Sequence, residues 1–164
     1  MAPQKLRQIK REIRVLGVAA RRDPRGYIIV GVVYRGNLWL DGVLKAHSIE
    51  THITEPIAEM LLRSPHLGQV RVILASRTYL PAEVIISTAE LYARTGKPVI
   101  ILGDSLEATG LWRSEGEKVG FSVEGLSRWS AIGVLKASTR EGIIPEALRV
   151  AALTLSALPD GVDT

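Results

Sequence analysis

Two apolar runs that stand only three residues apart constrain the fold more than any other feature of the sequence. Residues 27–34 and 38–46 have the β-branched and aromatic content of strands, and Arg35-Gly36-Asn37 between them is a short turn containing glycine. A third strand-like run at 13–19 precedes them. The chain is therefore expected to begin with an antiparallel meander of three strands. A doubly wound nucleotide-binding fold would instead place a helix directly after its first strand.

After the meander, helical and strand-like segments alternate. Residues 104–128 are rich in glycine and polar side chains and predict no regular element, and 129–137 is interpreted as a late strand or an irregular flap. The predicted helices are Thr54 to about Arg63, 81–95 and 145–158, and the predicted buried strands are 70–74 and 99–102. An antiparallel meander followed by parallel βαβ units predicts an α/β chain with a ribonuclease-H-like three-layer fold, in which helices cover a mixed sheet.

Length and composition indicate one domain. The chain has 164 residues, of which 46% are hydrophobic, so we expect a single domain over 1–164 with a basic segment at 1–11 and a flexible tail at 159–164. The absence of cysteine excludes disulfides, thiolate zinc sites and cysteine nucleophiles, and favours a cytoplasmic location. No stretch approaches the roughly 18 uninterrupted apolar residues of a membrane span, so no membrane partner is expected.

Positive charge is concentrated in the first part of the sequence. Residues 1–35 contain nine Lys and Arg against Glu12 and Asp23, whereas the remaining residues contain 12 against 15 acids. Such a surface can bind phosphates, because neutralising them releases counterions. A solvated basic tail explains the same asymmetry without a ligand. The aromatic content of 5% argues against a single-strand binder built on base stacking.

Two distinctive stretches carry a resemblance to a known family. Residues 33–44 read Val-Tyr-Arg-Gly-Asn-Leu-Trp-Leu-Asp-Gly-Val-Leu, and residues 144–151 read Ile-Pro-Glu-Ala-Leu-Arg-Val-Ala. Together with 13–18 and 68–74, they resemble a small archaeal family of unknown function that looks like a distant relative of endonuclease V. The resemblance covers about residues 10–158.

This resemblance implies where catalytic carboxylates should stand. Endonuclease V and its relatives cut nucleic acid with divalent metal held by acids, and two-metal chemistry needs acids that converge on ions about 4 Å apart. The expected positions are the end of the first strand, the start of the first helix and the end of the fourth strand. In this sequence they are occupied by Ala19-Ala20, Glu55 and Ala75. A lone glutamate would be a poor Mg²⁺ site, so we expect no metal site, no cofactor and no nuclease activity.

Basic residues near these positions suggest that the expected catalytic site binds anions instead of metal ions. The fold should bring Arg21 and Arg22, after the first strand, close to Arg77 and Thr78, after the fourth. A positive cluster there could hold nucleic acid or another anion without cutting it. Three solvated loop arginines are the competing interpretation.

Other polar residues have plausible structural roles. Glu55 in a first helical turn is favoured by the helix dipole, and Asp23 and Asp104 are expected in turns or helix caps. No role follows for Asp41 beyond that of a polar partner at an edge. The spacing of His47 and His52 matches no familiar metal-ligand pattern.

Three hypotheses therefore remain open. The first is a non-cutting, endonuclease-V-like protein, a pseudoenzyme that binds nucleic acid or another anion. The second is a divergent metal-dependent endonuclease or hydrolase that uses Glu55 with Asp23 or Asp104, and Mg²⁺ or Mn²⁺. The third is an assembly protein without chemistry, a homo-oligomer formed through the apolar edge of the meander.

Overall fold

The predicted meander is present and longer than expected. In a computed structural model that describes residues 3, 8–103 and 109–160, the first three strands are β1 (Arg14–Asp23), β2 (Gly26–Arg35) and β3 (Trp39–Ser48). The sequence predicts a loop at 21–26, but β1 and β2 stay paired as far as Asp23 and Gly26. Gly26 adopts a φ of 139°, which allows a tight turn that a side chain would strain.

In the part of the chain that the structure describes, seven strands form one mixed sheet, which confirms the predicted fold class. The order is β3-β2-β1-β4-β5-β7-β6, in which β4 (Val72–Ser76) and β5 (Val99–Leu102) run parallel to β1. The last two strands, β6 (Gly110–Ser114) and β7 (Glu117–Glu124), form an antiparallel hairpin beside β5. This hairpin lies within 104–128, where the sequence predicts no regular element.

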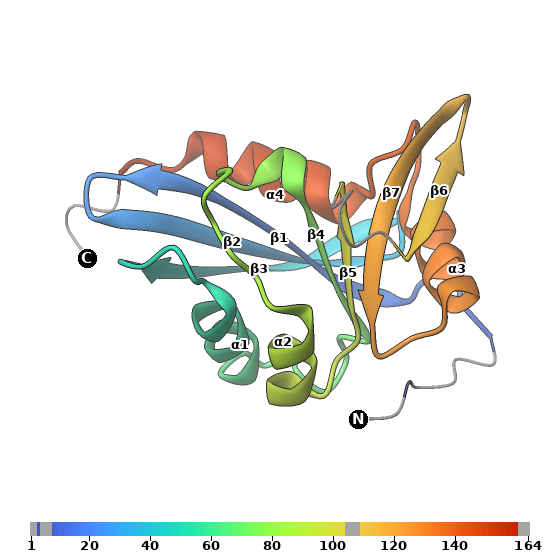
Figure 1. Ribbon diagram of the computed structural model, residues 1–164, viewed down its shortest axis with the longest axis horizontal. Coiled ribbons are helices and arrows are strands. Elements are labelled where there is room, and N and C mark those ends of the chain that lie inside the picture. The colour runs from blue at the N-terminus through green and yellow to red at the C-terminus, as the bar shows by residue number, and fades with distance from the viewer. Residues whose placement is uncertain (1–2, 4–7, 104–108, 161–164) are drawn as a thin grey trace.

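Helices cover both faces of the sheet. Figure 1 shows α1 and α2 on one side and α4 on the other, with α3 near the end that carries β6 and β7. No helix in the described ranges is long and apolar enough to cross a membrane. The bounds are α1 (Thr54–Leu62), η1, a short 3-10 helix (Arg77–Tyr79), α2 (Thr88–Thr95), α3 (Arg128–Ser138) and α4 (Glu146–Ala157).

The predicted helix over 81–95 is wrong in its first half, because α2 begins only at Thr88. The backbone of Ile85 pairs instead with the segment before α1: its N–H donates to Thr51 O and its carbonyl accepts from Ile53 N. These bonds replace the helical ones over 81–87. The Thr54 hydroxyl oxygen accepts the Ser87 N–H at 2.9 Å and so joins the starts of α1 and α2.

The prediction of a strand or flap at 129–137 is also wrong, since this segment is α3. Ser127 caps the helix by accepting the Ser130 N–H at 3.1 Å. Ala131, Val134 and Leu135 are buried at helical spacing. The serine followed by this apolar stripe is the sequence signal for the helix.

Alternation along β1 creates two hydrophobic cores, one on each sheet face. Val15 and Ala19 belong to the core beneath α3 and α4, and Leu16, Val18 and Ala20 belong to the core beneath α1 and α2. Gly17 lies directly under α4, where an added Cβ would stand 2.6 Å from the carbonyl carbon of Ala147. The absence of a side chain at residue 17 therefore lets α4 approach the sheet closely.

Replacing Gly17 with alanine is expected to lower the free energy of unfolding by about 2 kcal/mol, as in other overpacked cores. The reason is that the new methyl group meets helix backbone, which cannot turn aside as a flexible side chain can. Urea denaturation followed by circular dichroism measures the change.

The matched control is Gly68→Ala, because a Cβ at residue 68 would meet nothing within 4 Å. It should change the free energy of unfolding by no more than about 0.5 kcal/mol. Equal stability of the two variants would contradict the close contact between α4 and β1.

Candidate functional site at the carboxyl end of β1 and β4

The place where endonuclease-like acids were expected is the sheet edge at which β1 and β4 end. These strands are adjacent and parallel, with Val18 opposite Ala75. Their carboxyl ends therefore open on one edge, where ligands commonly bind in α/β sheets. Beyond this pairing β1 continues to Asp23, and the short helix η1 directly follows β4.

Ala19, Glu55 and Ala75 do not share one pocket, contrary to expectation. Ala19 is fully buried in the core beneath α4, whereas Ala75 is buried in the core on the opposite face. The strand alternation that separates them places Ala20, not Ala19, on the same face as Ala75. All three methyl groups are packing groups in the hydrophobic interior.

Glu55 joins two helices. Its carboxylate accepts from Arg94 Nε of α2 at 3.0 Å, and the same guanidinium contacts Glu59 at 2.7 Å. The Glu55 side chain is 58% exposed. This surface ion pair, together with the position in the first turn of α1, gives the residue a structural role.

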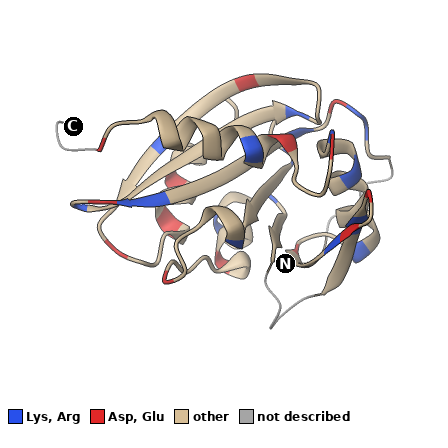
Figure 2. Ribbon diagram, turned by 90° about the horizontal axis from the view of Figure 1, so that it is seen from above, with Lys and Arg blue, Asp and Glu red and all other residues tan. Residues whose placement is uncertain are grey.

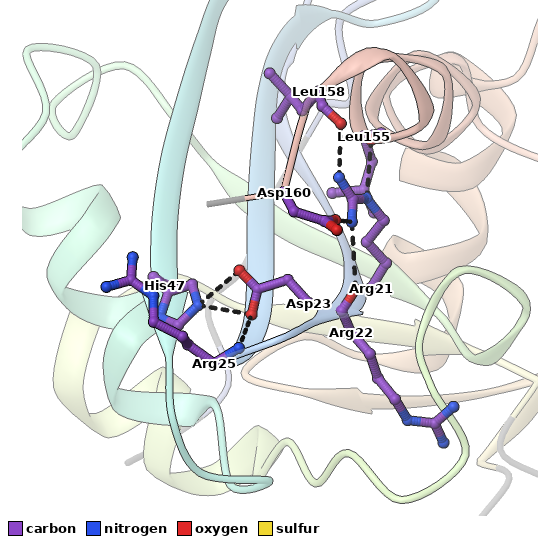
Figure 3. A network of polar contacts seen from close by, with 8 residues as sticks. All are labelled: Arg21, Arg22, Asp23, Arg25, His47, Leu155, Leu158 and Asp160. Carbon is purple, nitrogen blue, oxygen red and sulfur yellow. Dashed lines mark hydrogen bonds and ion pairs between the residues drawn. The ribbon is translucent and has the colours of Figure 1, made fainter. Parts of the chain in front are cut away.

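The other candidate acids also have partners or fall outside the described part. Asp23 contacts His47 Nε2 with both carboxylate oxygens at 3.0 Å, and its side chain is only 1% exposed. Figure 3 shows this pair at the tip of the β1–β2 hairpin. Asp104 lies outside the described residues. Within residues 3, 8–103 and 109–160, no three His or acidic side chains stand close enough to hold a metal ion.

Arg21 fastens the carboxyl end of α4 to the hairpin. Its guanidinium donates to the carbonyls of Leu155 at 3.2 Å and Leu158 at 2.6 Å, and it pairs with Asp160 at 2.8 Å. A cation suits this position, because the last carbonyls of a helix have no partner inside the helix. Part of the predicted flexible tail is therefore held by β1, as Figure 3 shows.

Arg22 points away from Arg21 and binds the carboxylate of Glu83 through two nitrogens. Tyr27 donates its hydroxyl to the same carboxylate at 2.8 Å. The hydrogen bond from Arg22 is the main cause that lowers the pKa of Glu83 from 4.5 to about 2, with help from Tyr27. The Arg22 charge is thus paired with an internal acid.

Arg77 holds the segment that follows β4. Its guanidinium donates to the carbonyls of Val84 at 3.0 Å and Pro81 at 3.1 Å, which closes the loop between η1 and α2. Thr78 is exposed, and its N–H donates to Ser76 Oγ at 3.3 Å. None of these hydrogen bonds joins Arg77 or Thr78 to Arg21 or Arg22.

A shallow pocket of about 410 Å³ does form at this edge. We call it the carboxyl-edge pocket. Arg21, Arg22 and Thr78 line it, which brings three of the four predicted anion-binding residues together, and Arg77 is not among its lining residues. Ala20, Leu80 and Leu155 supply apolar walls. Because both arginines already have acid partners, the pocket offers little uncompensated charge to an anion.

Asp41 has the role that sequence reasoning could not supply. Its carboxylate accepts from Arg14 Nε at 2.9 Å and from Arg35 Nε at 2.8 Å. Partial burial alone would raise the pKa of Asp41, but the hydrogen bonds from Arg35 and Arg14 outweigh it and hold the pKa below its usual value. The three residues form an ion network at the opposite end of β1.

The described strands form a sheet of the ribonuclease-H-like kind, and Ala20 and Ala75 stand where the resemblance to endonuclease V implies carboxylates. No family model matches the sequence. The UPF0215 protein of Methanothermobacter thermautotrophicus is 31% identical over an alignment that covers 98% of this chain and 95% of that protein. The chain belongs to the UPF0215 family, confirming the archaeal family indicated by the sequence.

Solved structures confirm the fold. A protein of unknown function from Archaeoglobus fulgidus has a TM-score of 0.72 and 22% identity, covering 88% of this chain and 96% of that one. The endonuclease V of Streptomyces avermitilis has a TM-score of 0.63 and 16% identity, with coverage of 87% and 79%. The ribonuclease-H-like sheet predicted from the element order is therefore present, and it matches that of endonuclease V structures.

The pairing of Arg22 with Glu83 predicts a pH effect. Because the folded pKa of Glu83 is depressed, its contribution to stability is present above pH 4.5 and is lost as the pH falls toward about 2. Replacing Arg22 with glutamine should raise the Glu83 pKa toward 4.5 and remove most of this acid dependence. Carboxyl carbon NMR titration measures the pKa directly.

The control is Arg113→Gln, which removes an exposed arginine on β6 and should leave the Glu83 titration unchanged. An unaltered Glu83 pKa in the Arg22 variant would show that the guanidinium is not committed to this acid. It would then be available to a ligand in the carboxyl-edge pocket.

Proposed function

We propose that this protein binds nucleic acid without cutting it. The observation that carries the proposal is that Ala20 and Ala75 pack on one face where β1 and β4 end, at positions where the resemblance to endonuclease V implies metal-binding acids. Alanine offers no donor atom, and the surviving acid Glu55 is paired with Arg94. The chemistry of cleavage has therefore lost its ligands, while the fold is retained.

Binding is supported by the fold and by charge. The sheet is that of structures described as endonuclease V, whose name denotes action on nucleic acid. The chain has a net charge of +4 and carries its excess of Lys and Arg within residues 1–35. Figure 2 shows basic residues at both ends of the long meander. Phosphate backbones are attracted to such surfaces without any need for catalytic metal.

Fluorescence anisotropy with labelled single-stranded DNA, duplex DNA and RNA tests the proposal. We expect binding that weakens as salt rises, because each neutralised phosphate releases counterions. The same nucleic acids incubated with Mg²⁺ or Mn²⁺ should remain intact. Failure to bind any of them at low salt would refute the proposal.

The Glu55→Gln variant separates binding from residual hydrolysis. It should bind as the parent protein does, because the Glu55 carboxylate contacts Arg94 on the surface. Metal-dependent cleavage by the parent that disappears in this variant would instead establish the divergent hydrolase.

Self-association is a second candidate, favoured by the surface of β3. This edge strand exposes Trp39, Leu40 and Val43 to between 46% and 47% of their area. Uncovered edge strands with apolar side chains readily pair with a second copy. Light scattering on the binding samples decides the matter: a monomer across micromolar concentrations removes this candidate.

A further inference from the structure

A second, more positive pocket lies at the opposite edge of the sheet. It has a volume of about 580 Å³ and is lined by Lys10, Arg14, Arg35 and Arg71, together with Glu12. We call it the amino-edge pocket. Among its described lining residues, Glu12 is the one carboxylate. The composition is unlike that of the carboxyl-edge pocket, where apolar side chains form the walls.

Strand directions explain why these cations converge. Arg14 begins β1 and lies opposite Arg35, which ends the antiparallel β2. Arg71 stands directly before β4, which is parallel to β1, and its N–H donates to Arg14 O at 2.9 Å. Residues far apart in the sequence are therefore fixed at one edge by backbone bonds.

Asp41 orients the guanidinium groups of Arg14 and Arg35 through their Nε atoms, and it leaves their terminal nitrogens available. It accepts from the Nε atoms of Arg14 and Arg35, at 2.9 Å and 2.8 Å. In the ranges that the structure describes, the terminal nitrogens of these two arginines make no hydrogen bond. One carboxylate thus orients two guanidinium groups without neutralising both of them.

The other two cations of the pocket, Lys10 and Arg71, have fewer acid partners than Arg14 and Arg35. Lys10 and Arg71 form no ion pair with any residue among 8–103 and 109–160. Next to Arg71, partial burial and then the positive charge of Arg71 lower the pKa of Lys97. Four cations line the pocket against Glu12, with Asp41 shared between two of them. Like charges held this close are unfavourable unless an anion joins them.

We infer that the amino-edge pocket binds phosphate groups, using Arg14, Arg35, Arg71 and Lys10 as the contacting cations. Guanidinium groups present paired N–H donors that match two phosphate oxygens, and orientation by an internal acid reduces the entropy lost on binding. The phosphates belong either to a nucleic-acid backbone or to a small phosphorylated compound. Only the first source rests on the proposed function.

The test removes Lys10 and Arg71, the two pocket cations that form no ion pair with any described residue. Lys10→Gln with Arg71→Gln takes away charge without breaking the Asp41 network. The matched control is Arg113→Gln with Lys118→Gln, which removes two exposed cations from paired positions on β6 and β7. The probes are inorganic pyrophosphate, followed by calorimetry, and a short labelled oligothymidine, followed by anisotropy.

We expect the pocket variant to bind pyrophosphate roughly tenfold or more weakly than the parent, since two charge-assisted contacts are lost. For the oligonucleotide, the slope of log affinity against log salt should fall by about 1.4, or about 0.7 for each lost contact to a single strand. The control variant should match the parent in both assays.

The outcomes separate this inference from the proposed function. If the parent binds the oligonucleotide and the pocket variant binds it equally well, the amino-edge site is refuted while nucleic-acid binding stands. If the parent binds pyrophosphate through the pocket but none of the DNA and RNA probes of the proposed function, the site stands and its ligand is a small phosphorylated compound. If the parent binds neither pyrophosphate nor the oligonucleotide, the amino-edge site is refuted, and duplex DNA and RNA decide the proposed function.

Discussion

The burial of β1 on both of its faces is the constraint on which the rest of the structure depends. Ala19 packs beneath α4 and Ala20 packs in the core beneath α1 and α2, and they are 0% and 4% exposed. A carboxylate at residue 19 would be surrounded by apolar side chains, and a buried charge without a partner is strongly unfavourable. The small residues here leave room for helices to pack over the end of the strand, where the resemblance to endonuclease V implies acids.

The same constraint explains why the arginines after β1 are structural. Arg21 binds the last carbonyls of α4, and Arg22 binds Glu83. Arg21 thus joins the carboxyl end of α4 to the β1–β2 hairpin, and Arg22 joins the loop that contains Glu83 to the same hairpin. A cluster of four cations with few acid partners stands at the other end of β1, around Arg14 and Arg71. The UPF0215 chain has an endonuclease-V-like sheet, and we propose that it contacts phosphate away from the expected catalytic edge.

Much of the fold could be predicted because its signals are local. The short turn at 35–37 sets the meander, and apolar runs mark β4, β5 and α4. The start of α2 was missed because a long-range pairing of Ile85 with residues before α1 overrides its helical pattern. The serine cap of α3 was available in the sequence at Ser127, but the stripe behind it was interpreted as extended.

The site was harder to predict, because it depends on which face each side chain occupies. Neighbouring residues of a strand point to opposite faces, so Ala19 and Ala20 belong to different cores. The sequence alone does not show which of the two shares a face with Ala75. The excess of positive charge in residues 1–35 can be read from the sequence. In the structure, the antiparallel pairing of β1 and β2 places these cations at two opposite ends of the strands. Arg21 and Arg22 lie at the hairpin end, and Arg14 and Arg35 lie at the other.

Paramagnetic NMR with Mn²⁺ tests most directly the central claim that packing has replaced metal chemistry at the carboxyl edge. A bound Mn²⁺ ion broadens the signals of nearby amides, so a site would be located as well as detected. The account predicts no selective broadening of residues 18–22 and 75–78 as Mn²⁺ is added. Selective broadening of these residues at a stoichiometric amount of metal would contradict it.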